Sequence, residues 1–533
     1  MTIGILTVIV YAFSWWNEFI SDDIAGIALN PSLGNFWKQA ATMNINNIVY
    51  SIIYVIFGPT PFWFHINNTI THVATIFLVY AVTWLISADK RISRITSLIF
   101  ALHPLETEGV TWISGYPYTI YTFFSLATVI VFILVDKKII RHIWIWSTAL
   151  LFLLALRSSE KAIVVPGILA LYLVVFSKVT FRKLFSLIPT AGVAAVYVVF
   201  LFFNLFKRIE YINPAYQTGE PIVYNPLEQI PTAIGSYVQL MLLPYNLTLY
   251  HEFLVYSPVH FAISIGVTVF VLLAIVFFWK RNPLVSFGLG FFVVSLSPTL
   301  LPVNIAWIVA ERYVHFGTVG FFIAVSALFT TIVKRFRIPD DRVFMTLAIL
   351  VIILGGLTIK RNLEWRSQDT FWPVTMKVSP YSAYAHNNMG DYYGRNGDIQ
   401  NSIASFERAR KLRPRYAEAT HNLGNVYEAI GEATKAAELF EEAISYNPTQ
   451  YQSYQKRGKI LYMLGDAGKA ADMFAKSAAI NPDPFDDYIS LYVIFGRAGK
   501  KDEQQAILRK AYSLASDNQE RMMILERVLY ENK

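Results

Sequence analysis

Long apolar stretches fill the first two thirds of this chain, and they constrain its fold more than any other feature. Eleven of them approach the length that a helix needs to cross about 30 Å of hydrocarbon. They lie near residues 1–17, 62–86, 95–112, 117–135, 143–156, 161–176, 184–206, 261–279, 284–301, 315–333 and 343–358. Of the 533 residues, 55% are hydrophobic and 15% are charged, and the mean hydropathy is +0.42. We therefore predict an all-α, polytopic membrane bundle of about eleven spans.

The positive charges indicate which side of the membrane each loop faces. The first 359 residues hold 21 of the 45 Lys and Arg residues. Fifteen of these 21 fall in one set of alternate loops if the apolar piece 230–243 does not cross the membrane. Because basic loops stay in the cytoplasm, we predict a cytoplasmic N-terminus, a re-entrant or interfacial helix at 230–243, and an outer C-terminal region. We expect the first apolar run to be a retained span, and a plasma-membrane location.

Acidic residues from distant parts of the chain meet on the predicted outer face. They are Asp22 and Asp23 of "SDD", Glu106 and Glu108 of "HPLETEG", Glu160 of "RSSEK" and Glu311 of "AERY". A carboxylate in the first outer loop suits a general base that takes the proton of a serine or threonine hydroxyl. The alternative for Asp22 and Asp23 is a helix N-cap or a solvated loop end.

Other polar residues on the same face have two interpretations each. His103, Glu106 and Glu108 either hold acceptor or sugar hydroxyls or are interfacial residues at a helix end. Arg157, Lys161 and Arg312 either stabilise a phosphate leaving group or pair with Glu160 and Glu311. The chain has no cysteine, no metal-ligand cluster and no glycine-rich phosphate loop. Its pI near 9.2 comes from loop bases and does not indicate nucleic-acid binding.

The last third of the chain repeats every 34 residues. The repeated positions are Pro380, Pro414, Pro448 and Pro482; Gly390, Gly424 and Gly458; and Phe406, Phe440 and Phe474. Period and phase resemble the tetratricopeptide repeat, in which the glycine permits close helix contact and the aromatic fills the core between helices. We predict three repeats over residues 383–484, a degenerate fourth and a final helix. Asn388 and Asn422 either bind a peptide backbone in the groove of this α-solenoid or are solvated polar residues.

Taken together, the motifs resemble a known family. The "DD" of the first outer loop, "PFWFHINNTITH", "ALHPLETEGVTWISG", "RSSEKAIVVP" and "AERYVHFGTVGF", followed by a repeat array, are similar to the transmembrane O-mannosyltransferases with tetratricopeptide repeats. These are relatives of the protein O-mannosyltransferases of the GT-C class. The resemblance implies a membrane glycosyltransferase domain of residues 1–358 and an extracytoplasmic repeat domain of residues 359–533.

The resemblance also implies a reaction. A sugar, expected to be mannose, moves with inversion from a polyprenyl-phosphate carrier to Ser/Thr hydroxyls of an exported protein that the repeats guide. By position, the family's catalytic acid maps to Asp22 and the family glutamate of "HPxHTE" to Glu108; Glu106 replaces a usual histidine. No cofactor is required, and although an acid pair can bind a divalent ion, the resemblance does not imply one. The alternatives are a membrane scaffold that docks an envelope-assembly partner, or transfer to a glycan or lipid.

Overall fold

The chain forms two compact units in a computed structural model. The structure describes residues 2–177, 179–216, 225–251, 258–300, 307–516 and 518–531. One unit is Met1–Asn204 with Val223–Ser379, and the other is Pro380–Lys533 with the segment Leu205–Ile222. The described residues form helices and turns and contain no strand, which confirms the predicted all-α class.

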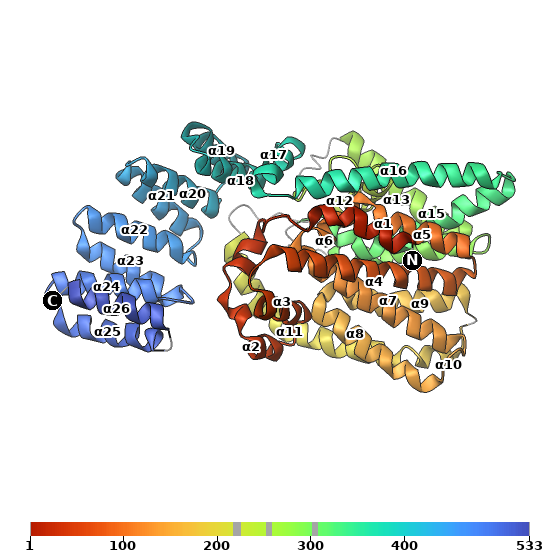
Figure 1. The fold of residues 1–533 in the computed structure, drawn as a ribbon, viewed down its shortest axis with the longest axis horizontal. Coiled ribbons are helices and arrows are strands. Elements are labelled where there is room, and N and C mark those ends of the chain that lie inside the picture. Colours follow the sequence, from red (N-terminus) through yellow and green to blue (C-terminus); the bar gives the residue numbers. More distant parts are fainter. Residues whose placement is uncertain are drawn as a thin grey trace. The chain divides into compact units, whose positions relative to one another are not determined.

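The helices of the first unit are named as in Figure 1. From the N-terminus to Ser379 they are α1 (Thr2–Tyr11), α2 (Phe36–Ala41), α3 (Ile45–Phe57), α4 (Pro61–Ser87), α5 (Lys90–Leu102), α6 (Thr107–Val110), α7 (Tyr116–Asp136), α8 (Ser147–Ser158), α9 (Val165–Phe176), α10 (Phe181–Phe185), α11 (Ile188–Tyr216), α12 (Pro226–Leu242), α13 (Pro258–Phe278), α14 (Pro283–Leu296), α15 (His315–Arg335), α16 (Asp340–Glu364) and α17 (Gln368–Val378).

Several of these helices have the character of membrane spans. Within the described residues, five are long and apolar enough to cross a membrane, and each includes one of α4, α7, α13, α15 and α16. Five shorter apolar helices accompany them: Thr2–Ser14, Ile45–Phe57, His142–Ser158, Ile188–Phe203 and Pro283–Thr299. The chain is therefore a helical membrane protein, as its composition predicts.

Two segments differ from the sequence expectation. The apolar stretch 95–112 is not one continuous helix, because α5 ends at Leu102 and the chain turns at His103 and Pro104. Proline ends a helix because it lacks the backbone N–H and restricts the residue before it. In addition, α3 lies between the predicted spans 1–17 and 62–86, where no helix was expected, and its Tyr50 is buried against Phe64.

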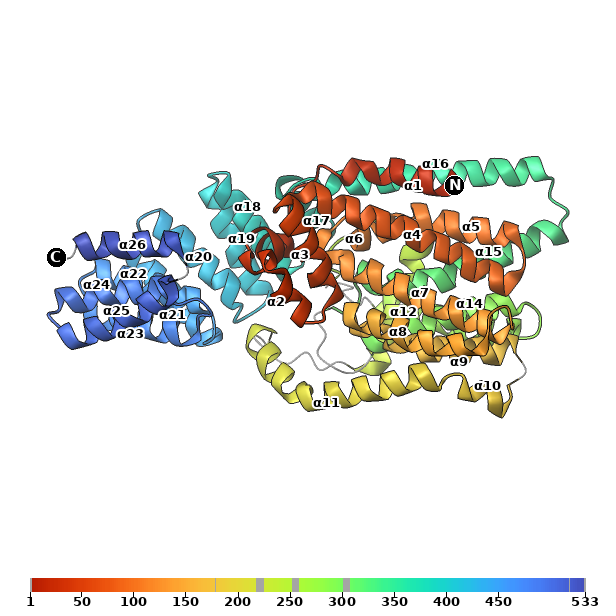
Figure 2. The ribbon, with the colours of Figure 1, turned by 60° about the horizontal axis from the view of Figure 1, so that its bottom comes forward.

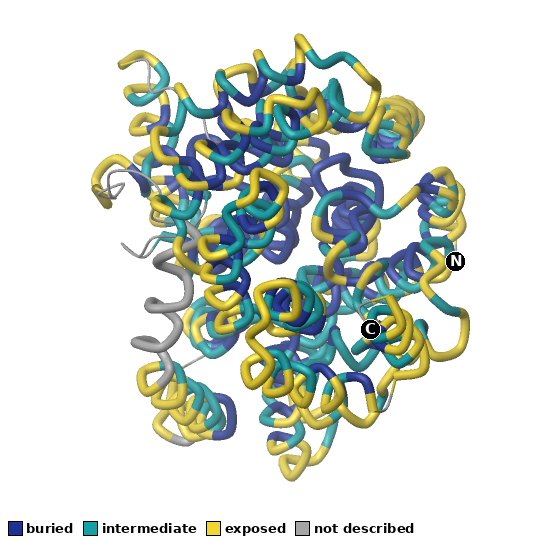
Figure 3. The backbone as a smooth tube through the Cα atoms, turned by 90° about the vertical axis from the view of Figure 1, so that its left-hand side faces the viewer, coloured by how far each residue is buried: buried dark blue, intermediate teal, exposed yellow. Residues whose placement is uncertain are grey.

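Small residues bring the central helices into close contact. A Cβ added at Gly288 of α14 would lie 2.4 Å from the carbonyl oxygen of Gly320 in α15. Such small-residue contacts let membrane helices pack where apolar burial alone provides little driving force. Helices α4, α5, α7, α14 and α15 contact one another in the centre of the bundle (Figures 1 and 2). Buried residues gather inside the bundle, and exposed ones lie around it (Figure 3).

The second unit is built from helix pairs. They are α18 (Ala383–Arg395) with α19 (Ile399–Leu412), α20 (Ala417–Ala429) with α21 (Ala433–Tyr446), α22 (Tyr451–Met463) with α23 (Ala467–Ile480), and α24 (Phe485–Arg497) with α25 (Lys501–Ala515), followed by α26 (Gln519–Glu531). The three clear repeats, the degenerate fourth and the final helix of the sequence prediction are all present. Each pair and its neighbour contact in succession, as in a solenoid.

The glycine and aromatic positions of the repeats are in contact, as predicted. A Cβ added at Gly390 would lie 2.7 Å from the Phe406 ring, and one at Gly424 would lie 2.8 Å from the Phe440 ring. A second set of glycines occupies the turn inside each pair with left-handed backbone. Their φ angles are +77° at Gly397, +85° at Gly431, +88° at Gly465 and +68° at Gly499. Glycine is needed there because a Cβ disfavours this conformation.

Candidate active site

Asp23 anchors the first loop to the start of α7. One of its carboxylate oxygens accepts hydrogen bonds from the Ser114 backbone N–H at 2.7 Å and from the Ser114 hydroxyl at 2.5 Å. The other accepts from the Ile20 backbone N–H at 3.2 Å. The side chain is buried, and burial raises the pKa of Asp23 to about 7 although these three hydrogen bonds oppose the shift. Asp23 therefore holds the loop in place and is not free for an external proton donor.

Asp22 differs from its neighbour because it stays accessible to solvent. Partial desolvation raises the pKa of Asp22, and the positive charge of Arg312 and a hydrogen bond from Ser21 offset part of that rise. Ser21 itself has left-handed backbone, with φ of 57°, an uncommon conformation for a residue with a Cβ. The turn thus directs Asp22 outward within electrostatic range of Arg312, while Asp23 points inward.

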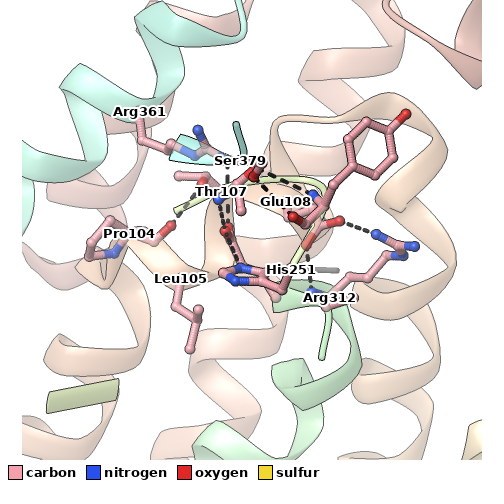
Figure 4. Close-up of polar contacts among 12 residues, drawn as sticks. Pro104, Leu105, Thr107, Glu108, His251, Arg312, Arg361 and Ser379 are labelled. Atoms are coloured by element: carbon pink, nitrogen blue, oxygen red, sulfur yellow. Dashed lines mark hydrogen bonds and ion pairs between the residues drawn. The ribbon is translucent and has the colours of Figure 1, made fainter. Parts of the chain in front are cut away.

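Glu108 and Arg312 form a buried ion pair, 204 residues apart in the sequence. The Arg312 side chain donates to Oε1 of Glu108, and the Arg312 backbone N–H donates to Oε2 at 2.9 Å (Figure 4). The guanidinium also lies 5.4 Å from the centre of the Trp112 ring and 5.0 Å from that of Tyr313. Aromatic faces and a carboxylate together offset the cost of burying this cation.

The loop that Asp23 anchors and the segment that carries Glu108 both contact the turn Ile113–Gly115. A Cβ added at Gly115 would lie 2.1 Å from the carbonyl oxygen of Glu108, so only glycine permits this approach. Ser114, the preceding residue, is the residue that Asp23 holds. The loop that carries Asp22 and the backbone that carries Glu108 are therefore packed on the same short turn.

Lys161 is a second cation placed among aromatic rings. Its ammonium nitrogen lies 3.4 Å from the centre of the Tyr313 ring and 5.9 Å from that of Tyr118. Both it and Arg312 therefore contact the ring of Tyr313. Glu160, the preceding residue, is exposed. Burial and the positive charge of Arg312 lower the pKa of Lys161 to about 7. Two basic groups thus converge near Tyr313, and an anionic phosphate beside them would favour the charged form of Lys161.

Arg157 and Glu311 have structural partners that the sequence did not indicate. Arg157 donates to backbone carbonyls of the α2–α3 connection, at 2.7 Å for Met43. Glu311 accepts from the Thr248 backbone N–H at 2.5 Å and lies 3.2 Å from Nε2 of His251 (Figure 4). Neither arrangement is the pairing between sequence neighbours, Arg157 with Glu160 or Arg312 with Glu311, that the sequence offered as an alternative.

His103 and Glu106 are buried below the site. Nδ1 of His103 accepts from the Leu105 backbone N–H at 3.2 Å, so its Nε2 donates to the Met241 carbonyl at 3.0 Å. Glu106 lies against His315, with 2.5 Å between its Oε2 and Nδ1 of that histidine. These two residues therefore contact the interior, whereas Glu108 contacts Arg312.

The last span contributes residues that sequence reasoning missed. Arg361 of α16 lies 3.7 Å from Glu311 and 3.0 Å from Glu364. The side-chain oxygen of Asn362 accepts a hydrogen bond from the Thr111 hydroxyl at 2.6 Å. Asn362 is uncharged, so no pattern of charges in the sequence marks it. Ser114, Tyr118 and Tyr313 were also missed, because no single-sequence pattern marks a serine or tyrosine as a site residue. The only feature of the sequence that could have indicated these three residues is their position shortly after "HPLETEG" or directly after "AER".

The repeat asparagines make contacts within their own unit. Asn388 donates to the Tyr384 carbonyl at 2.9 Å, one turn earlier in α18. Asn422 donates to the Asn387 side chain at 3.1 Å, which links the first two repeats. In the third repeat, Lys456 instead pairs with Glu428 at 2.7 Å.

The described residues include no group of three or more His, Cys, Asp or Glu side chains placed to hold a metal ion. Both carboxylate oxygens of Asp23 already accept hydrogen bonds. This leaves Asp22 as the accessible carboxylate of the pair. The arrangement consequently combines one accessible carboxylate, Asp22, within electrostatic range of Arg312, with a second basic side chain, Lys161, that shares the Tyr313 ring with Arg312.

Comparison with known proteins finds relatives over most of the chain. Protein O-mannosyl-transferase TMTC3 of Mus musculus is 22% identical over 473 residues, which cover 76% of this chain and 50% of that protein. Protein O-mannosyl-transferase F38B6.6 of Caenorhabditis elegans is 21% identical over 462 residues, covering 76% of this chain and 61% of that protein. The chain is a relative of the protein O-mannosyl-transferases. It spans about half the length of the first of these relatives and 61% of the second.

The repeat region matches a second set of proteins. A tetratricopeptide repeat family model matches residues 387–454 and 429–484, as the 34-residue period predicts. Among solved structures, the crystal structure of MamA covers 27% of this chain and 85% of its own, at 24% identity and a TM-score of 0.26. The similarity to protein O-mannosyl-transferases extends well beyond these repeats, since it covers 76% of the chain.

The raised pKa of Asp23 predicts a pH-dependent stability for this O-mannosyl-transferase relative. A buried carboxyl with a folded-state pKa of about 7 and an ordinary value of 3.8 binds more protons in the folded state between those values. The protonated Asp23 carboxyl therefore favours the folded state, and this contribution to the free energy of unfolding is complete below pH 3.8 and is lost as pH rises through 7. The melting temperature of the parent should therefore fall more steeply from pH 5 to 7.5 than that of Asp23→Asn.

The control for this measurement is Glu18→Gln, which removes an exposed acid from the same loop. It should keep the parental slope of melting temperature against pH, because the Glu18 side chain is exposed and leaves the buried Asp23 and its hydrogen bonds in place. Equal slopes for the parent and Asp23→Asn would contradict a raised pKa at Asp23.

Proposed function

We propose that this chain is an inverting glycosyltransferase that moves mannose from a polyprenyl-phosphate carrier to Ser/Thr hydroxyls of exported proteins. The names of its relatives support mannosyl transfer to protein. The observation that carries the proposal is the accessible carboxylate of Asp22 within electrostatic range of Arg312, which is held by buried Glu108. A soluble nucleotide-sugar donor would not explain a site built at the ends of apolar helices.

The proposed chemistry is a single displacement. The acceptor hydroxyl gives its proton to the Asp22 carboxylate as its oxygen attacks the anomeric carbon of the sugar. The bond from that carbon to the phosphate oxygen breaks, and the electron pair leaves with the phosphate. Arg312 and Lys161 stabilise the negative charge that develops on this leaving group. One base is enough, because no water has to be activated by a second carboxylate.

Supporting residues keep these groups in position. Glu108 holds the Arg312 side chain and backbone, and Asp23 fixes the turn from which Asp22 projects. We propose that the repeats deliver the acceptor protein, since tetratricopeptide arrays present a surface suited to extended chains. Asn388 and Asn422 lie on the first helices of their repeats and are candidates for backbone recognition. We also propose that the site faces the outside of the plasma membrane.

Two other functions remain alternatives to be separated by experiment. A membrane scaffold would use the repeats alone and would have no need of Asp22. A transferase for glycan or lipid acceptors would use the same site but not the repeats. The Glu108–Arg312 pair and the Asp22 carboxylate within its electrostatic range favour the enzyme over the scaffold, because ionisable residues buried in a membrane unit are expensive and are by default candidates for function.

The test supplies purified full-length chain with synthetic polyprenyl-phosphate mannose and a serine- and threonine-rich protein acceptor. We expect mannose to appear on acceptor hydroxyls, as detected by mass spectrometry. A chain that lacks residues 380–533 should transfer less to the protein acceptor than to a short peptide at high concentration. Transfer to lipid or glycan alone would favour the second alternative, and no transfer to any acceptor would favour the scaffold.

A further inference from the structure

A groove lies between α5, α15 and α16 at the side of the membrane unit. It has a volume of about 300 Å³ and a wall of aliphatic and aromatic side chains. The lining residues are Ile95 and Ile99 of α5, Val325 and Phe329 of α15, and Thr346, Leu347, Ile349, Leu350 and Ile353 of α16. The groove therefore faces the region that lipid chains occupy around a membrane protein.

The lining residues Ile95, Phe329 and Thr346 lie within about two turns of the ends of α5, α15 and α16 that face away from the candidate active site, and these ends are called the groove mouth below. The other ends of these helices lie at the site, because α5 leads to Glu108, α15 follows Arg312, and Arg361 near the end of α16 contacts Glu311. The ion pairs Arg91–Asp340 at 2.8 Å and Lys334–Asp89 at 3.0 Å tie the opposite ends together. The 21 residues of α15 correspond to a length of about 30 Å.

These helix ends carry an excess of positive charge. Residues 89–94 and 334–342 together contain seven Lys and Arg residues and three aspartates. Two of the aspartates, Asp89 and Asp340, already pair with Lys334 and Arg91. Among the residues that the structure describes, no carboxylate lies within ion-pair distance of Arg335, Arg337 or Arg342. The mouth of the groove therefore has basic side chains available for an anion.

The basic and apolar features are continuous along α16. Arg342, Thr346 and Leu350 follow at four-residue spacing, so they lie on one face of the helix. Arg342 is exposed at the groove mouth, and the two residues that follow on this face line the groove. Phe336, next to Arg335 and Arg337, has 73% of its surface exposed. Exposed aromatics beside bases are typical of helix ends at a membrane interface.

We propose that this groove binds one anionic phospholipid of the leaflet opposite the active site. Its phosphate would contact Arg342 and the Arg335–Arg337 turn, and an acyl chain would lie against Ile99, Phe329 and Leu350. A free phosphate would satisfy the bases and leave the apolar wall uncovered, whereas a neutral lipid would cover the wall and leave the bases unpaired. Basic pockets between membrane helices recognise anionic headgroups by this combination.

The test measures lipid binding to the purified full chain by native mass spectrometry in mild detergent. The probes are phosphatidylglycerol and phosphatidylcholine with identical acyl chains. The parent should bind phosphatidylglycerol preferentially. Arg337→Gln with Arg342→Gln should weaken that binding about 30-fold, because each base near an anionic headgroup contributes about 1 kcal/mol. Ile349→Trp should weaken the binding of both lipids, because its larger side chain fills the groove.

The matched control is Lys138→Gln with Arg141→Gln, which removes two exposed bases from another loop. This variant should keep the parental affinity. Equal weakening in both double variants would assign the effect to general surface charge and overturn the site. Equal binding of the two lipids, or full displacement by inorganic phosphate, would also overturn it. Ile349 is 52% exposed, so its replacement should fold, and an unaltered melting temperature verifies this.

Discussion

Replacing Asp22 with asparagine is expected to lower sugar transfer about 10²–10⁴-fold, the usual contribution of a general base. The substitution keeps the size of the side chain but removes the atom that accepts the hydroxyl proton. Because the Asp22 side chain is accessible to solvent, its replacement should change the melting temperature little. The measurement compares initial rates of mannose transfer from synthetic polyprenyl-phosphate mannose, with binding of the donor followed separately.

Two variants of nearby acids complete this comparison. Glu18→Gln removes an exposed acid of the same loop and should transfer at the parental rate. Asp23→Asn should reduce transfer less than Asp22→Asn while weakening the hold on Ser114, because Asp23 positions the turn and does not take the proton. An Asp22→Asn protein that folds normally and transfers at the parental rate would remove the catalytic role and favour the scaffold.

Replacing Glu108 with glutamine is expected to lower both stability and transfer. The single substitution leaves the Arg312 guanidinium buried without its carboxylate, and breaking such a pair costs about 3–5 kcal/mol. It also frees the Arg312 side chain from the position in which it would meet the leaving phosphate. Unfolding by denaturant in detergent and initial transfer rates measure the two effects.

The double variant Glu108→Gln with Arg312→Gln separates these effects. Removing both charges should recover much of the lost stability, since a buried pair replaced as a whole is often nearly neutral. Transfer should stay low, because the cation that stabilises the leaving group is absent and such contacts contribute about 3 kcal/mol. Recovery of transfer together with stability would show that Arg312 is structural. Arg395→Gln, in an exposed pair with Asp391, serves as the control and should change stability little.

Local periodic signals determined much of this protein from sequence. The length of the apolar stretches predicts a helical membrane unit, because each span must satisfy its own backbone hydrogen bonds. The 34-residue recurrence of Gly390, Gly424 and Gly458 predicts the repeats and their aromatic contacts, since every repeat solves the same packing problem. The position of "SDD" after the first apolar run also marks the acid pair as a candidate site.

Tertiary structure alone decided the surroundings of the individual acids. Asp22 and Asp23 are adjacent in sequence, yet only packing against Ser114 buries one and leaves the other accessible. Glu106 and Glu108 likewise differ only in what surrounds them. The partner of Arg312 is Glu108, 204 residues away, and not the adjacent Glu311. Burial and long-range ion pairing depend on how the helices pack, and no local pattern carries that information.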